Sequence, residues 1–272
     1  MFPPLEPALL DEARDRLRSY GYAVIPDAFD PAEITAEVVW AITTGCKAGF
    51  HLETAGLTVS ASYVPMTTAE TSASLSLLLS GAPIARKLLG RAVVPFRAKG
   101  TVYSHQTSWH RDTELDVSAV SILAYLDPLN ANTGALRVLP ESHLTPRVPA
   151  SKERSCGEVL STRPGDLIIL DERTLHSSAG GKIRRQWRAD YVAVPDTPEE
   201  ETVLKAYAAG IFSPGWDGGY DVTRFPSFGC GLLNALGAKE TVVLRQSGAL
   251  TAAEAEENYI RAVRGESSAT SN

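Results

Sequence analysis

The sequence predicts a mainly β protein with flanking helices, organised as a sandwich or barrel rather than an α/β sheet. From about residue 92, short apolar runs rich in β-branched residues alternate with turn signals such as Asp127-Pro128 and Pro164-Gly165-Asp166. Parallel α/β folds would instead show helical stretches between the strands. The chain has 272 residues, enough for one domain with a substantial core, and no segment repeats.

The first 50 residues are predicted to be helical with one short interruption. One helical face carries four apolar or aromatic residues, namely Leu10, Ala13, Leu17 and Tyr20. Gly21 ends this helix, and the strand-like segment 23–26 follows. Asp30-Pro31-Ala32-Glu33 then combines a capping aspartate with proline at the first helical position. A second helix should therefore run to about Thr44.

The strand-like runs lie within residues 92–195, which we expect to form the β core. They are the segments 92–104, 118–126, 134–139, 166–170 and 186–194. Residues 206–237 are rich in glycine and aromatic residues without a clear period, and we expect a lid-like segment there. A helix over 251–262 and a flexible tail over 266–272 complete a single domain spanning 1–265.

The composition argues against a nucleic-acid or membrane partner. The formal net charge is −6, and the basic residues are scattered rather than arranged in a stripe. No uncharged apolar run approaches the ~20 residues needed to cross a bilayer. The acidic N-terminal segment does not resemble a signal peptide, and the three cysteines are far apart. We therefore expect a cytoplasmic protein that acts on a small molecule, and we leave its oligomeric state open.

Candidate metal ligands occur in two places. In Trp109-His110-Arg111-Asp112, the histidine and the aspartate are two residues apart, so in an extended strand both side chains would project from one face. His176 follows the apolar run 166–170, near the expected exit of a strand. Two histidines and one carboxylate leave three positions open on a metal, an arrangement typical of ferrous iron rather than structural zinc.

Two arginines follow the second histidine. Arg184 and Arg188 lie on one face of the run 184–194, together with Gln186 and Asp190. A guanidinium group binds a carboxylate through two parallel hydrogen bonds, so either arginine could anchor a dicarboxylate. The sequence leaves open which of the two does so.

These motifs resemble the phytanoyl-CoA hydroxylase-like family of iron(II)/2-oxoglutarate-dependent oxygenases. The resemblance covers the opening segment 17–34, the His110–Asp112 motif, the loop and strand from Asp127 to His143, and the strand from Gly165 to His176. Positions that depart from the family pattern include Arg111, in place of a commoner glutamine, and Glu141, in place of a glycine.

The resemblance implies a double-stranded β-helix, that is, a cupin-like jelly roll. It also implies that His110, Asp112 and His176 bind iron(II). Ser178 and an arginine of the last strand would bind 2-oxoglutarate, with Tyr125 lining that pocket. The cofactors and co-substrates would be iron(II), 2-oxoglutarate and O2.

By the same resemblance, the reaction would be oxidation of a small organic substrate, with hydroxylation as the default. Epimerisation, desaturation and oxidative cyclisation use the same ligands, and tailoring of an antibiotic or another specialised metabolite would fit. Halogenating relatives lack the carboxylate, so Asp112 argues against halogenation. Two other classes stay open: a non-redox, metal-dependent cupin-type isomerase and a non-catalytic, carbohydrate-binding jelly roll.

Overall fold

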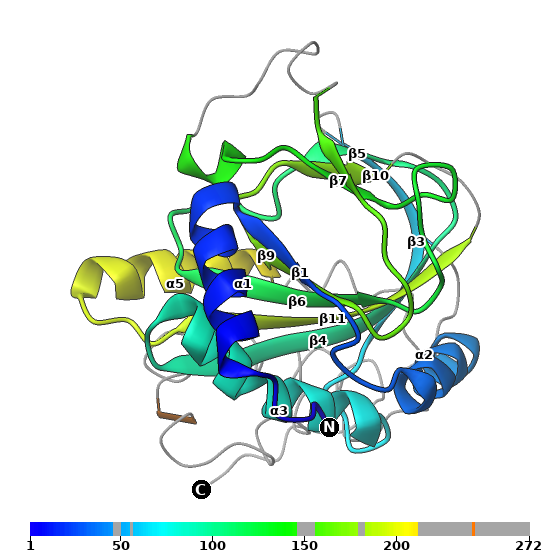
Figure 1. Cartoon of the computed structure of the whole chain (residues 1–272), viewed down its shortest axis with the longest axis horizontal. Coiled ribbons are helices and arrows are strands. Elements are labelled where there is room, and N and C mark those ends of the chain that lie inside the picture. The colour runs from blue at the N-terminus through cyan, green and yellow to red at the C-terminus, as the bar shows by residue number, and fades with distance from the viewer. Residues whose placement is uncertain (46–49, 55–56, 146–155, 179–182, 212–240, 243–272) are drawn as a thin grey trace, which may run out of the picture.

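The computed structural model describes residues 1–45, 50–54, 57–145, 156–178, 183–211 and 241–242. Within these residues, two antiparallel β-sheets face each other, and helices lie against the outer face of the larger sheet (Figure 1). This arrangement confirms the predicted mainly β fold with flanking helices.

The larger sheet contains seven strands among the described residues. In chain order they are β1 (Tyr22–Ile25), β2 (Phe50–Thr54), β3 (Leu57–Pro65), β4 (Val93–Tyr103), β6 (Ala119–Tyr125), β9 (Leu167–Asp171) and β11 (Arg184–Ala193). Their spatial order is β1-β9-β6-β11-β4-β3-β2, which places β11 at the centre.

The smaller sheet contains four short strands in the described part of the chain. These are β5 (Thr107–His110), β7 (Leu136–Val138), β8 (Glu158–Leu160) and β10 (His176–Ser178). They are arranged in the order β5-β10-β7-β8. From β4 to β7, and again from β8 to β11, successive strands alternate between the two sheets. Strands β9 and β10 therefore belong to different sheets although only four residues separate them.

Four α-helices and one 3-10 turn are described. They are α1 (Pro7–Tyr20), α2 (Ala32–Gly45), α3 (Ser72–Leu89), η1 (Ser142–Leu144) and α5 (Pro198–Ile211). The main core lies between α1, α2 and α3 and the outer face of the larger sheet, where Leu78 of α3 meets Trp187 and Tyr191 of β11. None of the described helices has the length and apolarity to cross a bilayer.

The two faces of β11 differ in chemistry. Trp187, Ala189 and Tyr191 belong to the core beneath the helices. The alternate positions from residue 184 to residue 190 face the space between the sheets and are all polar, namely Arg184, Gln186, Arg188 and Asp190. All four are buried. Polar residues buried in this number need partners or a function, so this row of side chains marks the centre of the site.

The structure corrects several predicted boundaries. The β core is not limited to residues 92–195, because β1, β2 and β3 extend the larger sheet from the N-terminal region. Helix α3 was not predicted, since Gly81 and Pro83 interrupt a serine-rich segment that nevertheless packs on β4 and β11. Segment 23–26 does form the expected strand, which becomes the edge strand β1.

The expected lid-like segment 206–237 falls mostly outside the described residues. Its first six residues complete helix α5, where Tyr207 and Ala208 are buried against Phe96 and Val94 of β4. That part of the segment is therefore packed rather than loop-like, and the prediction was wrong for it. Residues 212–237, the predicted helix over 251–262 and the tail 266–272 are not described, so those expectations stay predictions.

Candidate metal centre

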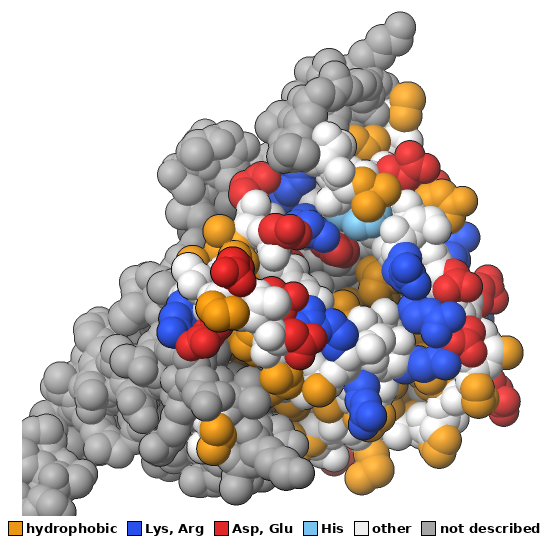
Figure 2. Space-filling model, turned by 90° about the vertical axis from the view of Figure 1, so that its left-hand side faces the viewer, with side chains coloured by type: hydrophobic (Ala, Val, Ile, Leu, Met, Phe, Trp, Pro, Cys, Tyr) orange, Lys and Arg blue, Asp and Glu red, His pale blue; other side chains and the backbone are white. Residues whose placement is uncertain are grey.

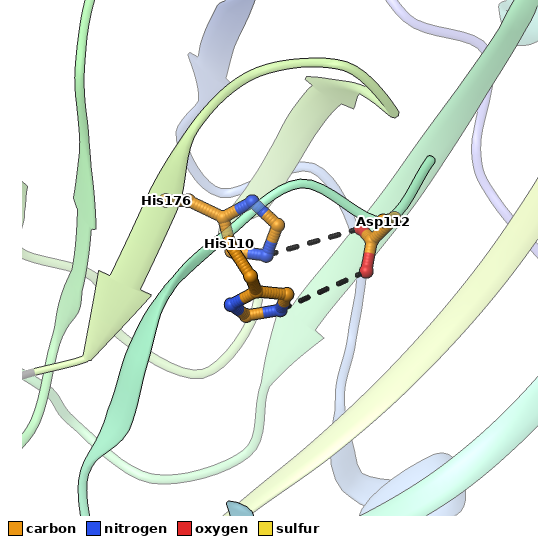
Figure 3. Close-up of side chains that lie close together, drawn as sticks. All are labelled: His110, Asp112 and His176. Atoms are coloured by element: carbon orange, nitrogen blue, oxygen red, sulfur yellow. Dashed lines mark ion pairs between the residues drawn. The ribbon is translucent and has the colours of Figure 1, made fainter. Parts of the chain in front are cut away.

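The structure brings together the three residues predicted as metal ligands. His110 is the last residue of β5, His176 is the first residue of β10, and the two are paired in register in the smaller sheet. The Asp112 carboxylate lies beside the two imidazoles, with Oδ1 3.9 Å from His110 Nε2 and Oδ2 3.8 Å from His176 Nε2. Figure 3 shows both rings turned toward this carboxylate. One ligand atom from each residue lies within 4.8 Å of the others, so one ion could contact all three.

Hydrogen bonds fix which imidazole nitrogen faces the cluster. His110 Nδ1 lies 2.8 Å from the Ser108 carbonyl oxygen, and His176 Nδ1 lies 2.9 Å from the Thr174 carbonyl oxygen. Because a carbonyl only accepts, each Nδ1 must carry the proton that it donates. A neutral ring then leaves Nε2 with a free lone pair, which is the form that binds a metal.

The electrostatic surroundings favour the metal-binding protonation states. Burial, assisted by the nearby His110, lowers the pKa of His176 to about 4, so this imidazole is neutral at pH 7. Burial alone would raise the pKa of Asp112. The positive charge of Arg188, followed by the two histidines, outweighs it and holds that pKa well below its usual range. The cluster thus includes the neutral imidazole of His176 and the ionised carboxylate of Asp112.

Asp112 reaches this position by a different route from the one predicted. Strand β5 ends at His110, so Asp112 lies in the turn beyond it and not on the same strand face. Its backbone N–H donates to the Glu172 carbonyl oxygen at 3.0 Å, as does the N–H of Thr113 at 3.2 Å. Glu172 lies between β9 and β10, so this contact ties the first ligand segment to the turn that precedes His176.

Arg111, one of the departures from the family pattern, reinforces the same junction. Its guanidinium donates to three carbonyl oxygens, those of Arg173 at 2.7 Å, Ser142 at 3.0 Å and Thr145 at 2.9 Å. Arg111 therefore joins the His110–Asp112 segment to η1 and to the turn before His176. Another departure, Glu141, has a φ of 64°, the left-handed conformation in which glycine is the least strained residue.

Arg184 lies at one end of the polar row on β11. It is 1% exposed and donates to the His105 carbonyl oxygen at 2.9 Å and to Ser178 Oγ. Its guanidinium carbon lies 4.9 Å from the centre of the Tyr103 ring. Among the described residues it has no carboxylate partner, and its Nε has no acceptor. The guanidinium is therefore a buried cation whose charge the described residues leave uncompensated.

Tyr125 belongs to the Arg184 end of the site. It pairs in register with Gln186, two residues from Arg184. Burial raises the pKa of Tyr125, with a smaller contribution from Tyr103, while hydrogen bonds with Arg184 and Gln186 act in the opposite direction. The phenol therefore keeps its proton at pH 7. The structure thus gathers Arg184, Ser178 and Tyr125, three of the four residues expected around the co-substrate.

Arg188 lies at the other end of the row and has different partners. Its guanidinium donates to Asp112 Oδ2 at 2.9 Å, to Asp190 Oδ1 at 2.6 Å and to Glu172 Oε1 at 2.6 Å. It also donates to Ser121 Oγ at 2.7 Å. Four acceptors, three of them carboxylates, surround this one cation. Arg188 therefore contacts the candidate metal ligands directly, which the sequence alone did not indicate.

Sequence reasoning missed two further ionisable groups in this network. Glu172 is fully buried, and burial, together with the negative charges of Asp190 and Asp112, raises its pKa to about 7 against the opposing effect of Arg188. Lys99 on β4 pairs in register with Arg188, and burial, with the charges of Arg97 and Arg188, lowers its pKa to about 7. The acidic turn before His176 was a signal for Glu172. The alternation along β4 was a signal for Lys99.

A second hollow lies outside the barrel and has no comparable chemistry. Its volume is about 260 Å³, and its wall includes Arg91, Arg173 and Glu200. Arg91 pairs with Glu200 and Asp196, and Arg173 pairs with Asp116, so these charges compensate one another. On the α5 side of the molecule, the acidic and basic side chains of the described residues are interspersed (Figure 2).

Several solved structures share the fold of this chain. The chain is 21% identical to the α-ketoglutarate-dependent epimerase SnoN from nogalamycin biosynthesis, with 70% of this chain and 82% of SnoN covered and a TM-score of 0.58. It is 23% identical to AviO1 from Streptomyces viridochromogenes Tue57, with 72% of this chain and 98% of AviO1 covered and a TM-score of 0.56. It is 20% identical to EctD from S. alaskensis, whose structure holds 2-oxoglutarate and 5-hydroxyectoine, with 67% of this chain and 76% of EctD covered and a TM-score of 0.52. At these identities the likeness establishes a shared fold.

No curated protein matches the chain in sequence. A family match is found for the segment that runs from the second half of α3 through both ligand-bearing strands to the start of β11. Over residues 82–186, which contain His110, Asp112 and His176, the chain matches the phytanoyl-CoA dioxygenase (PhyH) family, and this match confirms the resemblance read from the motifs.

Proposed function

We propose that this protein is a non-haem iron(II) oxygenase that uses 2-oxoglutarate and O2 to oxidise a small organic substrate. The observation that carries the proposal is the pairing of two features in one barrel interior. These are the cluster of His110, Asp112 and His176 and the buried Arg184 without a carboxylate partner among the described residues. The family match over residues 82–186 supports the same class of enzyme.

The three residues of the cluster fit iron(II) as ligands. Two imidazole nitrogens and one carboxylate, all from one side, form the facial triad typical of non-haem iron oxygenases. Structural zinc sites instead surround the ion with four protein ligands, and the described residues supply three. Bound iron(II) would supply O2 activation coupled to oxidative decarboxylation of 2-oxoglutarate, which gives succinate and CO2.

Arg184 and Ser178 would hold the far carboxylate of 2-oxoglutarate. Ser178 lies two residues after His176 on β10, a separation of about 7 Å along a strand, and the two side chains share one face. A short dicarboxylate could therefore reach from the metal to Arg184. Arg184 is favoured over Arg188 because three carboxylates already compensate the charge of Arg188. Tyr125 keeps its proton and would line the pocket as a hydrogen-bond donor.

We infer that the substrate is a specialised metabolite and that hydroxylation is the default outcome. Structural neighbours include the epimerase SnoN, in complex with Fe3+, α-ketoglutarate and nogalamycin RO, and the carbocyclase SnoK, both from nogalamycin biosynthesis. The shared fold thus supports several oxidative outcomes. Asp112 occupies the place that a halide would need, which argues against halogenation.

Anaerobic spectroscopy tests the proposal directly. Iron(II) and 2-oxoglutarate together should produce a weak visible charge-transfer band that neither gives alone. Addition of O2 should then form succinate. A metal-dependent isomerase would turn over without O2 or 2-oxoglutarate, and a carbohydrate-binding module would show neither the band nor succinate. Absence of the band from metal-loaded protein at saturating 2-oxoglutarate would refute the proposal.

A further inference from the structure

Arg188 is held in one orientation by the number of its contacts. The side chain is 6% exposed, and each of its three guanidinium nitrogens donates to at least one acceptor. On one side it meets Asp190 and Glu172, and on the other Asp112. A guanidinium fixed on three sides cannot turn toward an incoming ligand without breaking several charge-assisted hydrogen bonds.

A second arginine binds one of the carboxylates that Arg188 contacts. Arg97 on β4 binds Asp190 Oδ2 through Nε at 2.9 Å and through a terminal nitrogen at 2.8 Å. Asp190 thus receives Arg97 on one oxygen and Arg188 on the other. Because the Nε of Arg188 donates to Asp190, the guanidinium stays oriented with a terminal nitrogen toward Asp112.

The consequence for Asp112 is a restricted carboxylate. Its Oδ2 accepts from Arg188, and its backbone N–H is bound to the Glu172 carbonyl oxygen. Its Oδ1 accepts no hydrogen bond from the described residues and faces His110 Nε2. Chelation of a metal by both oxygens would compete with the bond from Arg188. Binding through one oxygen would not.

We propose that Arg188 is a positioning residue of the metal site, which holds Asp112 through Oδ2 so that the carboxylate offers the metal a single oxygen. This inference rests on the proposed function and specifies how the open positions are preserved. A carboxylate that bound through both oxygens would occupy one of the three sites needed by 2-oxoglutarate and O2. Arg188 would therefore act on the metal through Asp112, whereas Arg184 would act on the co-substrate.

Charge and geometry predict opposite signs for loss of Arg188. Removing a nearby positive charge should by itself tighten the binding of a metal cation. Removing the group that orients Asp112 should weaken it, by the 10- to 100-fold typical for partners of metal ligands. Metal affinity of the metal-free protein therefore separates positioning from simple charge compensation without any turnover.

The experiment is a calorimetric titration of the metal-free protein with Co2+, with thermal unfolding as a check on the fold. Arg188→Gln should bind Co2+ at least about tenfold more weakly than the wild type. Arg188→Lys keeps the charge but not the planar fork, so it should lie between the two. Arg185→Gln is the matched control, because Arg185 neighbours the same strand positions but pairs with Asp127 on the other face. It should bind as the wild type does.

A charge-balanced variant covers the case in which Arg188→Gln does not fold. The double variant Arg188→Gln/Glu172→Gln removes one charge of each sign and still lacks the donor to Asp112, so it too should bind Co2+ weakly. Wild-type or tighter Co2+ binding by the folded Arg188 variants would overturn the inference. A loss confined to 2-oxoglutarate affinity would overturn it as well, because Arg188 would then be the co-substrate anchor.

His176→Ala separates this inference from the proposed function. Loss of Co2+ binding in His176→Ala together with wild-type binding in Arg188→Gln would refute only the role of Arg188. Wild-type binding in His176→Ala would refute the metal site itself.

Discussion

The two ends of the inner face of β11 hold the same residue type in opposite electrostatic settings. Arg188 is surrounded by three carboxylates, whereas Arg184 contacts a hydroxyl, a carbonyl oxygen and an aromatic ring. Both are buried, and three residues separate them on one strand. A buried cation with its own anions serves the architecture, while one without them is ready for an anion from outside. The difference assigns the two arginines to different tasks.

The largest effect on succinate formation should come from substitutions of the three candidate metal ligands. His110→Ala, Asp112→Ala and His176→Ala should each reduce succinate formation to background, because each removes one of three ligands. Bound iron should fall in parallel, while circular dichroism stays like that of the wild type. Wild-type turnover in any one variant would remove that residue from the ligand set.

The second-largest effect is expected for Arg184, the proposed binding partner of the 2-oxoglutarate carboxylate. Arg184→Gln should weaken 2-oxoglutarate binding by about 2–5 kcal/mol, since a desolvated carboxylate loses its charged partner. Affinity for Co2+ alone should stay unchanged. Calorimetry with Co2+ and then 2-oxoglutarate measures both, with Arg185→Gln again as the control. If the loss appears in metal affinity instead, the division of labour between the arginines is reversed.

A smaller effect is expected for the hydroxyl beside Arg184. Ser178 Oγ accepts from Arg184 and also from the Thr107 backbone N–H at 3.0 Å. Ser178→Ala should weaken 2-oxoglutarate binding by about 1–2 kcal/mol, because it removes a hydrogen-bonding group and leaves Arg184 less firmly held. An unchanged dissociation constant for 2-oxoglutarate would show that the pocket does not use this hydroxyl.

The smallest effect is expected for Lys99, which pairs in register with Arg188 on the neighbouring strand. Its pKa falls from 10.5 to about 7 in the folded protein, so between these pH values the unfolded chain binds a proton that the folded chain has released. The free energy of unfolding of the wild type should therefore rise with pH in this window. Relative to Lys99→Met, we expect a gain of about 1 kcal/mol from pH 7 to pH 9, after allowing for solvent screening. Urea unfolding of both proteins at the two pH values measures it, and parallel curves would contradict the burial of the ammonium.

The sequence predicted that the two arginines share a strand face, but it did not predict their different partners. The period-2 pattern in residues 184–194 correctly placed Arg184 and Arg188 on one face, because alternation along a strand is a local property. Which anions each would meet is not local. Asp112, Glu172 and Ser121 approach Arg188 from three other segments of the chain.

The metal cluster shows the same division between local and non-local information. The spacing of His110 and Asp112 indicated a shared ion, yet Asp112 reaches it from a turn, held by a backbone bond to Glu172. Glu172 lies in the acidic segment 171–173 and is fully buried, which the local sequence does not indicate. Strands β2 and β3 were missed because they depend on the larger sheet rather than on a strong pattern of their own: β3 pairs with β4, and β2 pairs with β3.

The distribution of the site over two sheets has a thermodynamic consequence. His110 and His176 belong to the smaller sheet, while Arg184 and Arg188 belong to the larger one. Asp112 is joined to both, since it follows β5 and accepts from β11. Any ligand that binds this set holds only when the sheets are closed on each other, so it stabilises the closed barrel by mass action. At a free ligand concentration of 100 times the dissociation constant, the gain is about 2.7 kcal/mol. Metal and co-substrate would thus stabilise the folded jelly roll as well as take part in the reaction within it.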